Sequence, residues 1–323
     1  MTPQPTRPQV LVTGAAGFVG SHLVDALLLQ DWTVVGFDNL TTGTLENLAN
    51  ARLQETFTLI EGDICDPKAV AKACEGCAIV FHLAAVTKVA ESLRQPHKYQ
   101  EINVTGTHHV LTGAVQAKVQ RIVFASSAAV YGPPETVPIP EDSATEPLSP
   151  YGASKLEGEQ LCQTIAAQHN LIIPQLRLFN IYGPRQHAAN QAGVVSIFMD
   201  RAHKGLPLTI FGDGNQTRDF IYIEDVIEAF LRTATRQSVS TGPMNVGTGI
   251  PVSLRELAEA VQHQVPTCST EIQFAPPRPG DIYHSVAQIT RMQHQLDFTP
   301  TFTLHDGLHH YYQQIFASIE DTI

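Results

Sequence analysis

The stretch "QVLVTGAAGFVG" at residues 9–20 decides the fold. It starts as an apolar, β-branched run, continues through Gly14, Gly17 and Gly20, and ends where a helical apolar pattern begins. Glycines at this spacing allow a tight turn and let the N-terminus of a helix approach a pyrophosphate closely. Because strand, loop, helix and a second strand follow in that order, we interpret the stretch as a dinucleotide-binding loop. A glycine-rich turn without a ligand is the alternative.

Outward from this loop, short apolar runs alternate with helical patterns. Runs that are apolar on both faces and separated by helices are typical of a parallel sheet covered on both sides. We therefore predict an α/β fold with a doubly wound parallel sheet of Rossmann type. The predicted helices include 18–30, 67–74 and 99–117, and the predicted strands are 9–14, 33–38, 57–63, 78–84, 121–127 and one long strand at 171–184.

The composition changes near residue 180, after which turn-rich segments are frequent. One helix in this part opens with the capping box Ser253-x-x-Glu256. We predict a dinucleotide-binding domain at 1–180 and a smaller α/β substrate lobe at 181–323, with some crossing of the chain between them. This lobe is expected at the carboxyl edge of the sheet, where open α/β sheets bind ligands.

The composition excludes several classes of partner. A formal net charge of -11 argues against nucleic acid, because proteins that bind it concentrate Lys and Arg. No apolar run reaches membrane-spanning length, and residues 1–9 lack the apolar stretch of a signal peptide, so we expect a frayed tail there and no membrane partner. Five scattered cysteines indicate reduced thiols and a cytoplasmic location. Cys74 and Cys77 form a lone CxxC without further ligands at metal spacing, so no metal is predicted.

Asp38 ends the second predicted strand, 24 residues after Gly14. A carboxylate at that point accepts hydrogen bonds from the ribose hydroxyls of NAD and repels the 2′-phosphate of NADP. The sequence therefore predicts NAD as the cofactor.

Tyr151 and Lys155 lie one helical turn apart in "SPYGASK" (149–155). Ser149 is suited to an N-cap and Pro150 to the first helical position, so the pair is expected on one face near a helix N-terminus. An ammonium and a positive helix end both favour a phenolate, which would make Tyr151 a usable base. A chance pairing is the alternative when this feature is taken alone.

Together these motifs resemble the extended short-chain dehydrogenase/reductase family, and most closely its nucleotide-sugar epimerase and dehydratase branch. The resemblance runs nearly end to end. It is carried by "GFDNLTTG" (36–43), "EGDICD" (61–66), "HLAA" (82–85), "INVTGT" (102–107), "SSAAVYG" (126–132), "SPYGASK" (149–155), "RLFNIYGPRQ" (177–186), "GDGNQTRDFIYIEDV" (212–226) and "RPGD" (278–281).

The resemblance implies a role for each matching residue. Tyr151, Lys155 and Ser127 would be catalytic, with Ser127 on the sugar 4-hydroxyl and Lys155 on the nicotinamide ribose while it lowers the pKa of the tyrosine. Asn103 would belong to the structural and proton-relay set, and Asp63 and Ile64 would contact adenine. The cofactor-binding residues implied are Gly14, Gly17, Phe18, Gly20, Asp38, Asn39, Asp63, Ile64, Leu83, Ala84, Ala85, Asn103, Tyr151 and Lys155. Those implied for substrate binding are Ser127, Asn180, Arg185, Arg218, Arg278, Asp281 and Ser285.

The residues after Ser127 indicate the reaction. Dehydratases and decarboxylases of this branch carry carboxylates there, whereas this chain has Ala128 and Ala129, which cannot act as a general acid. The resemblance therefore implies NAD-dependent C4 epimerisation of a UDP-sugar through a transient 4-keto form. Another nucleotide-sugar oxidoreductase, such as a 4-reductase, and a non-catalytic nucleotide sensor are the alternatives.

Two residues bear on the sugar. Ser285, four residues after Asp281, stands where a bulky side chain would restrict the pocket to plain hexoses, so an N-acetyl group would fit. Arg185 could face a C6 carboxylate and favour UDP-glucuronate, or it could face solvent. The resemblance also implies a homodimer through the helices that follow "YQEINVTGT" (99–107) and "SPYGASK".

Overall fold

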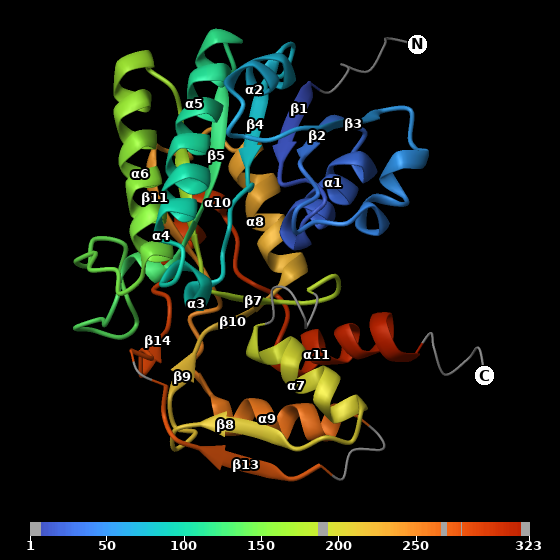
Figure 1. Ribbon diagram of the computed structural model, residues 1–323, viewed down its shortest axis with the longest axis vertical. Helices are drawn as coiled ribbons and strands as arrows, with labels where there is room; N and C mark the ends of the chain where they lie inside the picture. The colour runs from blue at the N-terminus through green and yellow to red at the C-terminus, as the bar shows by residue number, and fades with distance from the viewer. Residues whose placement is uncertain (1–7, 187–192, 266–269, 279, 318–323) are drawn as a thin grey trace.

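The structure, a computed structural model, describes residues 8–186, 193–265, 270–278 and 280–317. The expected N-terminal tail lies outside these residues, apart from its last two. Seven parallel strands form the main sheet, which Figure 1 shows in the upper part of the molecule. In order across the sheet they are β11 (Gly242–Val246), β6 (Pro174–Leu178), β5 (Arg121–Ser127), β4 (Ile79–His82), β1 (Gln9–Thr13), β2 (Thr33–Asp38) and β3 (Phe57–Glu61).

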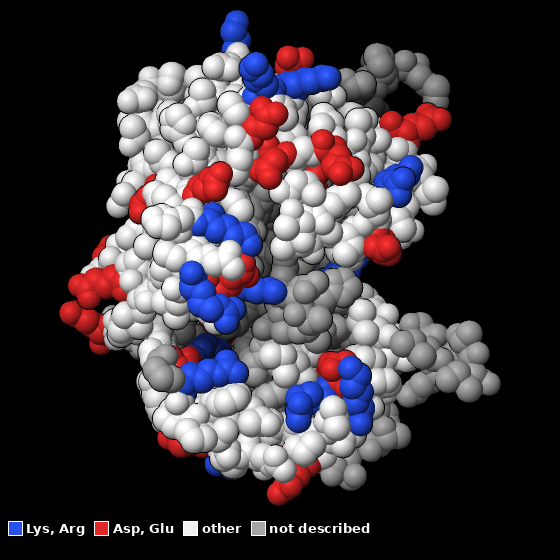
Figure 2. All heavy atoms as spheres, in the orientation of Figure 1, with Lys and Arg blue, Asp and Glu red and all other residues white. Residues whose placement is uncertain are grey.

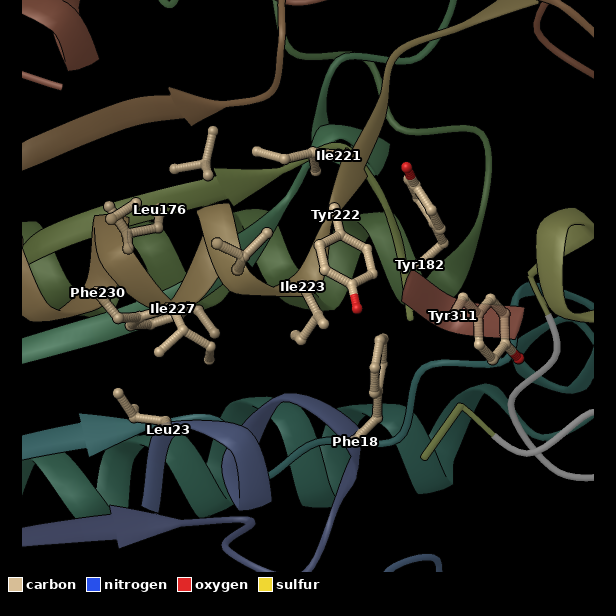
Figure 3. Close-up of a cluster of buried hydrophobic side chains, with 14 of the residues drawn as sticks. Phe18, Leu23, Leu176, Tyr182, Ile221, Tyr222, Ile223, Ile227, Phe230 and Tyr311 are labelled. Carbon is tan, nitrogen blue, oxygen red and sulfur yellow. The ribbon is translucent and has the colours of Figure 1, made fainter. Parts of the chain in front are cut away.

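Helices cover both faces of this sheet, as the doubly wound prediction requires. One face carries α2 (Pro67–Cys74), α5 (Gly106–Gln116) and α6 (Pro150–His169), and the other carries α1 (Phe18–Leu29), α8 (Ile223–Thr235) and α10 (Thr290–Leu296). Figure 3 shows Phe18 and Leu23 of α1 facing Ile223, Ile227 and Phe230 of α8. Each such buried side chain contributes roughly 1.5–3 kcal/mol of transfer free energy.

The start signals read from the sequence are present in the structure. Ser149 caps α6 by accepting a hydrogen bond from the Gly152 N–H, with Pro150 as the first helical residue. The capping box at Ser253 opens α9 (Leu254–Gln264) in the second lobe. The helix predicted at 99–117 is divided. It runs as α4 (Pro96–Tyr99), the π-helical turn η3 (Gln100–Thr105) and α5.

The long strand predicted at 171–184 is wrong in one respect. It divides at Phe179, after β6, and the next residues form β7 (Asn180–Tyr182), which pairs with β10 (Phe220–Tyr222). The Phe179 N–H donates to Val246 O at 3.0 Å, and the Asn180 N–H donates to Asp219 O at 3.0 Å. Consecutive residues therefore bond to different sheets, which is why the strand breaks there.

The second lobe lies below the carboxyl edge of the main sheet in Figure 1. The chain leaves the sheet after β6, and α8, β11 and α10 lie again with the main sheet, while the division at residue 180 stays a prediction. None of the described helices is long and apolar enough to cross a membrane. The remaining elements of the lobe are α7 (Val194–His203), β8 (Leu208–Phe211), β9 (Thr217–Arg218), β12 (Val252–Ser253), β13 (Ile272–Ala275), β14 (His284–Ser285), α11 (Leu304–Tyr312) and the π-helical turn η5 (Gln313–Ala317).

Candidate active site

A cavity of about 800 Å³ lies at the carboxyl edge of the sheet. On the face shown in Figure 2, Lys and Arg side chains gather around the groove where the upper and lower parts of the molecule meet. Most of the predicted site residues line the cavity, although the segments that carry them are far apart in the sequence. They are Gly14, Gly17, Phe18, Gly20, Asp38, Asn39, Asp63, Ile64, Leu83, Ala84, Ala85, Ser127, Tyr151, Lys155, Asn180 and Arg278.

The glycine loop between β1 and α1 fits a pyrophosphate. Gly14 has a φ of +71°, which favours glycine, and Gly17 is the N-cap of α1. A Cβ on Gly14 would lie 2.8 Å from the Ala84 backbone nitrogen, so the residue has no room for a side chain. The helix N-terminus and its free N–H groups therefore meet the cavity over a bare backbone, as an anion requires.

Asp38 holds this loop and also lines the cavity. Its Oδ2 accepts a hydrogen bond from the Ala16 N–H at 2.9 Å, and its Oδ1 accepts one from the Leu40 N–H at 2.8 Å. Burial raises the pKa of Asp38, and these two bonds oppose that rise. The carboxylate oxygens retain lone pairs for ribose hydroxyls, so the residue fits the role that the sequence predicts.

Asn39 and Asp63 form the next part of the wall. Asn39 Nδ2 donates to Asp63 Oδ2 at 2.9 Å, and the Cys65 N–H donates to Asp63 Oδ1 at 2.8 Å. Partial burial acts to raise the pKa of Asp63, but the hydrogen bonds from Cys65 and Asn39 outweigh it and lower the pKa. Asp63 is therefore held as a carboxylate beside Ile64, at the β2–β3 end of the cavity.

Tyr151 and Ser127 converge in the cavity. Tyr151 comes from the first turn of α6 and lines the cavity together with Ser127, the last residue of β5, whose side chain is close enough to lower the pKa of Tyr151 against the rise that burial causes. Lys155 lies one turn further along α6 and is 4% exposed, with its Nζ donating to the backbone oxygen of Ala125 at 2.9 Å. The three side chains thus meet where the sequence predicts a catalytic set.

The sequence predicts a lowered pKa for Tyr151, and for the protein chain by itself this is wrong. Burial raises the pKa of Tyr151, and the hydrogen bond that opposes the rise comes from Ser127 and not from Lys155. Burial also lowers the pKa of Lys155 to about 8, against the charges of Cys162 and Glu159. The Lys155 ammonium is hydrogen-bonded to the Ala125 carbonyl. Burial is therefore the largest effect on the pKa of both Tyr151 and Lys155.

Asn103 lies behind the cavity and does not line it. It is in the π-helical turn, where its side chain bonds both the N–H and the carbonyl of Val86 at 2.9 Å and donates to Ser154 Oγ at 2.9 Å. Asn103 therefore fixes a cavity wall against α6, which fits the structural part of its expected role.

The residues predicted for the nucleotide are divided between two places. Asn180 and Arg278 line the cavity, and the Arg278 guanidinium stacks 4.1 Å from the ring centre of Phe211. Arg218 lies outside the lining, where its Nη2 bonds Asp281 Oδ1 at 2.6 Å. Ser285 pairs with Arg218 in the β9–β14 ladder and also lies outside the lining, so the structure gives no support for its expected place beside the sugar.

Arg185 is a correction. Its φ is +65°, and its Nη2 bonds Asp25 Oδ2 of α1 at 2.6 Å, so it neither lines the cavity nor faces open solvent. The next residue, Gln186, lines the cavity instead, and its Oε1 has no hydrogen-bond partner among the described residues. Sequence reasoning missed Gln186 because only the positive φ shows which of the two side chains turns inward. Lys88 and Arg94, which also line the cavity, had no motif to mark them.

The carboxylates in the lining do not suit dehydration. They are Asp38, Asp63 and Glu91, and Glu91 bonds Lys98 at 2.8 Å. Ala128 and Ala129 follow Ser127 in the short helix η4 (Ala128–Val130). Among the described residues, no group of His, Cys, Asp and Glu is arranged to hold a metal ion.

Comparison with known proteins gives one consistent family. The model of the NAD dependent epimerase/dehydratase family matches residues 10–247. A UDP-glucose 4-epimerase of Mycolicibacterium smegmatis is 38% identical over 302 residues, which cover 93% of this chain and 96% of that protein.

Two solved structures extend the comparison. UDP-glucose 4-epimerase of Thermotoga maritima, with UDP-glucose, has a TM-score of 0.90 and 32% identity, and the match covers 96% of this chain and 99% of that one. UDP-glucuronic acid 4-epimerase of Bacillus cereus, with UDP-glucuronic acid and NAD, has a TM-score of 0.88 and 32% identity, over 98% of this chain and 100% of that one. The resemblance read from the motifs is confirmed, and the chain belongs to the NAD dependent epimerase/dehydratase family.

Proposed function

We propose that this chain is an NAD-dependent 4-epimerase of a UDP-sugar. The observation that carries the proposal is that Tyr151 and Ser127 line the same cavity as the glycine loop and Asp38, with Ser127 close enough to lower the pKa of Tyr151 against the rise that burial causes. The relatives named as UDP-glucose 4-epimerases support it. The absence of a carboxylate at Ala128 and Ala129 favours epimerisation over dehydration.

When bound, the cofactor would accept a hydride from C4 of the sugar and return the same hydride to the sugar, so that the net reaction is redox-neutral. Gly14, Gly17 and Asp38 would hold its pyrophosphate and ribose. Tyr151 takes the proton of the sugar 4-hydroxyl while Ser127 holds the oxygen. Because burial raises the pKa of Tyr151, the phenolate would need the positive charge of an oxidised nicotinamide, with the Lys155 ammonium one helical turn away on the same face of α6.

Epimerisation then requires the 4-keto sugar to turn over and accept the hydride on its other face. The nucleotide must stay bound during this step. Arg278 fits that task, since its guanidinium can grip phosphate oxygens while its plane stacks on Phe211. Tyr151 returns the proton to the C4 oxygen, which completes the cycle.

We propose UDP-glucose and UDP-galactose as the substrate pair. Arg185 supports no preference for a uronate, because its guanidinium is bound to Asp25. Two further predictions rest on the sequence alone. They are a homodimer through α5 and α6 and a cytoplasmic location. Leu156, Leu161 and Ile165 of α6 are partly buried against the chain's own core clusters, so they support the dimer only weakly.

The test is to offer UDP-glucose, UDP-galactose, UDP-N-acetylglucosamine and UDP-glucuronate to the purified protein and to assign the C4 configuration of each product by NMR. Tyr151→Phe should lower turnover by about 10²–10⁴-fold with bound NAD intact. Tyr222→Phe is the matched control, because Tyr222 is buried and its hydroxyl has no partner among the described residues. Normal turnover in Tyr151→Phe with NAD in place would overturn the proposal.

The competing 4-reductase must exchange NAD(H) with solution. An epimerase should instead retain stoichiometric NAD through purification and turn over without added cofactor. Turnover that depends on added NADH would favour the reductase.

A further inference from the structure

Three consecutive residues of β5 each lie next to one side chain of α6, and two of them are hydrogen-bonded to it. Lys155 Nζ donates to the Ala125 backbone oxygen at 2.9 Å, and Ser126 Oγ donates to Glu159 Oε1 at 2.5 Å. Tyr151 lies beside Ser127 in the cavity lining, where burial raises the pKa of Tyr151 and Ser127 acts to lower it. Residues 151, 155 and 159 are spaced by four, so they share one face of α6. Tyr151 and Ser127 therefore form the last of three contacts that fix the position of β5 along the axis of α6.

Glu159 is the middle contact and has no part in the mechanism above. Its side chain is 1% exposed, and it binds Arg177 of β6 at both oxygens, with Nε to Oε1 at 2.9 Å and Nη2 to Oε2 at 2.7 Å. Ser126 and Arg177 are register partners in the sheet. One carboxylate thus ties two neighbouring strands to α6 at the edge of the cavity, next to the lining residues Ser127 and Leu178.

Arg177 is itself fixed on its other sides. Its guanidinium carbon lies 4.7 Å from the ring centre of Tyr131, and its Nη1 donates to the Glu141 backbone oxygen at 2.9 Å. The Tyr131 hydroxyl donates to Asn245 Oδ1 of β11 at 2.6 Å. The pair of Glu159 and Arg177 therefore has a single geometry, set by β6, β11 and the 128–141 segment together.

A buried ion pair is weak evidence for a role in stability, because the loss of hydration of both charges offsets their attraction. Its directional bonds are better suited to fixing a position. We propose that Glu159 and Ser126 are positioning residues that keep Ser127 in place beside Tyr151 in the cavity. This inference rests on the proposed epimerase function for its kinetic test, but not for its structural one.

The first test uses Ser126→Ala, which leaves Glu159 and Arg177 paired. We expect kcat to fall about 10–100-fold with KM within about threefold, because a displacement near 1 Å is worth up to about 10²-fold in rate. Ser126→Thr keeps the hydroxyl and should restore most of the loss. Thr233→Val is the control, since Thr233 is fully buried, hydrogen-bonded within α8, and separate from this network. An unchanged kcat in Ser126→Ala, or a loss that Ser126→Thr does not relieve, would overturn the inference.

The second test separates positioning from folding and from direct contact, since Ser126 also lines the cavity. Glu159→Leu combined with Arg177→Met removes both charges together, which is often neutral for stability. If the pair serves only the fold, a folded double variant should regain wild-type kcat. The proposal expects kcat to stay low at an unchanged content of bound NAD. Should that variant not fold, Ser126→Ala still decides.

Crystal structures of the wild type and of Ser126→Ala give a reading that needs no activity. The distance from Ser127 Oγ to the Tyr151 hydroxyl should be about 1 Å longer in the second than in the first. If the distance is the same in both, the inference is wrong at any turnover. If the wild type epimerises no nucleotide sugar while the distance still increases in Ser126→Ala, the proposed function fails and the positioning role stands.

Discussion

Gly14→Ala tests the glycine loop most directly. Gly14 has a φ of +71°, and a left-handed backbone costs an L-residue roughly 1–2 kcal/mol. The new Cβ would also lie 2.8 Å from the Ala84 nitrogen and 2.9 Å from its Cα, and neither backbone atom can swing away as a side chain would. Overpacking of this kind costs about 1–3 kcal/mol more, so we expect a total loss of about 2–5 kcal/mol.

Gly205→Ala is the matched control for the backbone term. Gly205 has a φ of +66°, and a Cβ there would meet no heavy atom within 4 Å. Its cost should be only the roughly 1–2 kcal/mol of the left-handed backbone. The difference between the two variants therefore measures the contact with Ala84 alone.

Urea unfolding of the NAD-free proteins gives both free energies, and calorimetric titration with NAD gives the affinity. Because Gly14→Ala moves the loop away from the β4 end of the cavity, NAD affinity should fall at least about tenfold, equivalent to about 1.4 kcal/mol. The affinity of Gly205→Ala should stay at the wild-type value. Equal destabilisation in the two variants, or wild-type affinity in Gly14→Ala, would refute the close approach described here.

Three further outcomes follow from the site and the core. Asp38→Asn should weaken NAD binding about tenfold and reduce the discrimination against NADP, because a charged acceptor is worth about 1.5–3 kcal/mol; parallel titrations with both dinucleotides measure this. Arg278→Lys keeps the charge but loses the stack on Phe211, so KM for the UDP-sugar should rise about tenfold with kcat little changed in steady-state kinetics. Burial lowers the pKa of His82 to about 3 and that of His22 to about 4, below the ordinary 6.5, so the unfolded chain binds more protons in that window. Each histidine should therefore cost up to about 1.4 kcal/mol of stability per pH unit as the pH falls below about 6.5, and urea unfolding of His22→Gln should show a smaller slope than the wild type.

The sequence was informative where local signals and the fold agree. The glycine spacing, the placement of Asp38 at a strand end and the Ser149 cap of α6 all depend on near neighbours, and the structure has each of them. The burial that raises the pKa of Tyr151 depends on the packed surroundings, so spacing along the helix could not show it. For the same reason, Arg185 carries a motif but pairs with Asp25, which is 160 residues away along the chain.

The Glu159–Arg177 pair shows the same limit. That Glu159 shares a face with Tyr151 is readable from the spacing alone. Its partner is set by the register of β5 against β6, which only the assembled sheet defines. The break at Phe179 was missed because the apolar pattern runs on through both strands, although they belong to different sheets.

That break also bears on how the two lobes can move. Phe179 is 5% exposed and is the single residue between β6 and β7, with a main-sheet bond on its own amide and a lobe bond on the next. This crossing has no intervening loop, so any movement of one lobe against the other at this point has to be absorbed by the dihedral angles of one packed aromatic residue. In a cavity where the sugar must rotate while the diphosphate stays bound, the wall at Phe179 is therefore rigid. The space for rotation has to come from movement of the other walls.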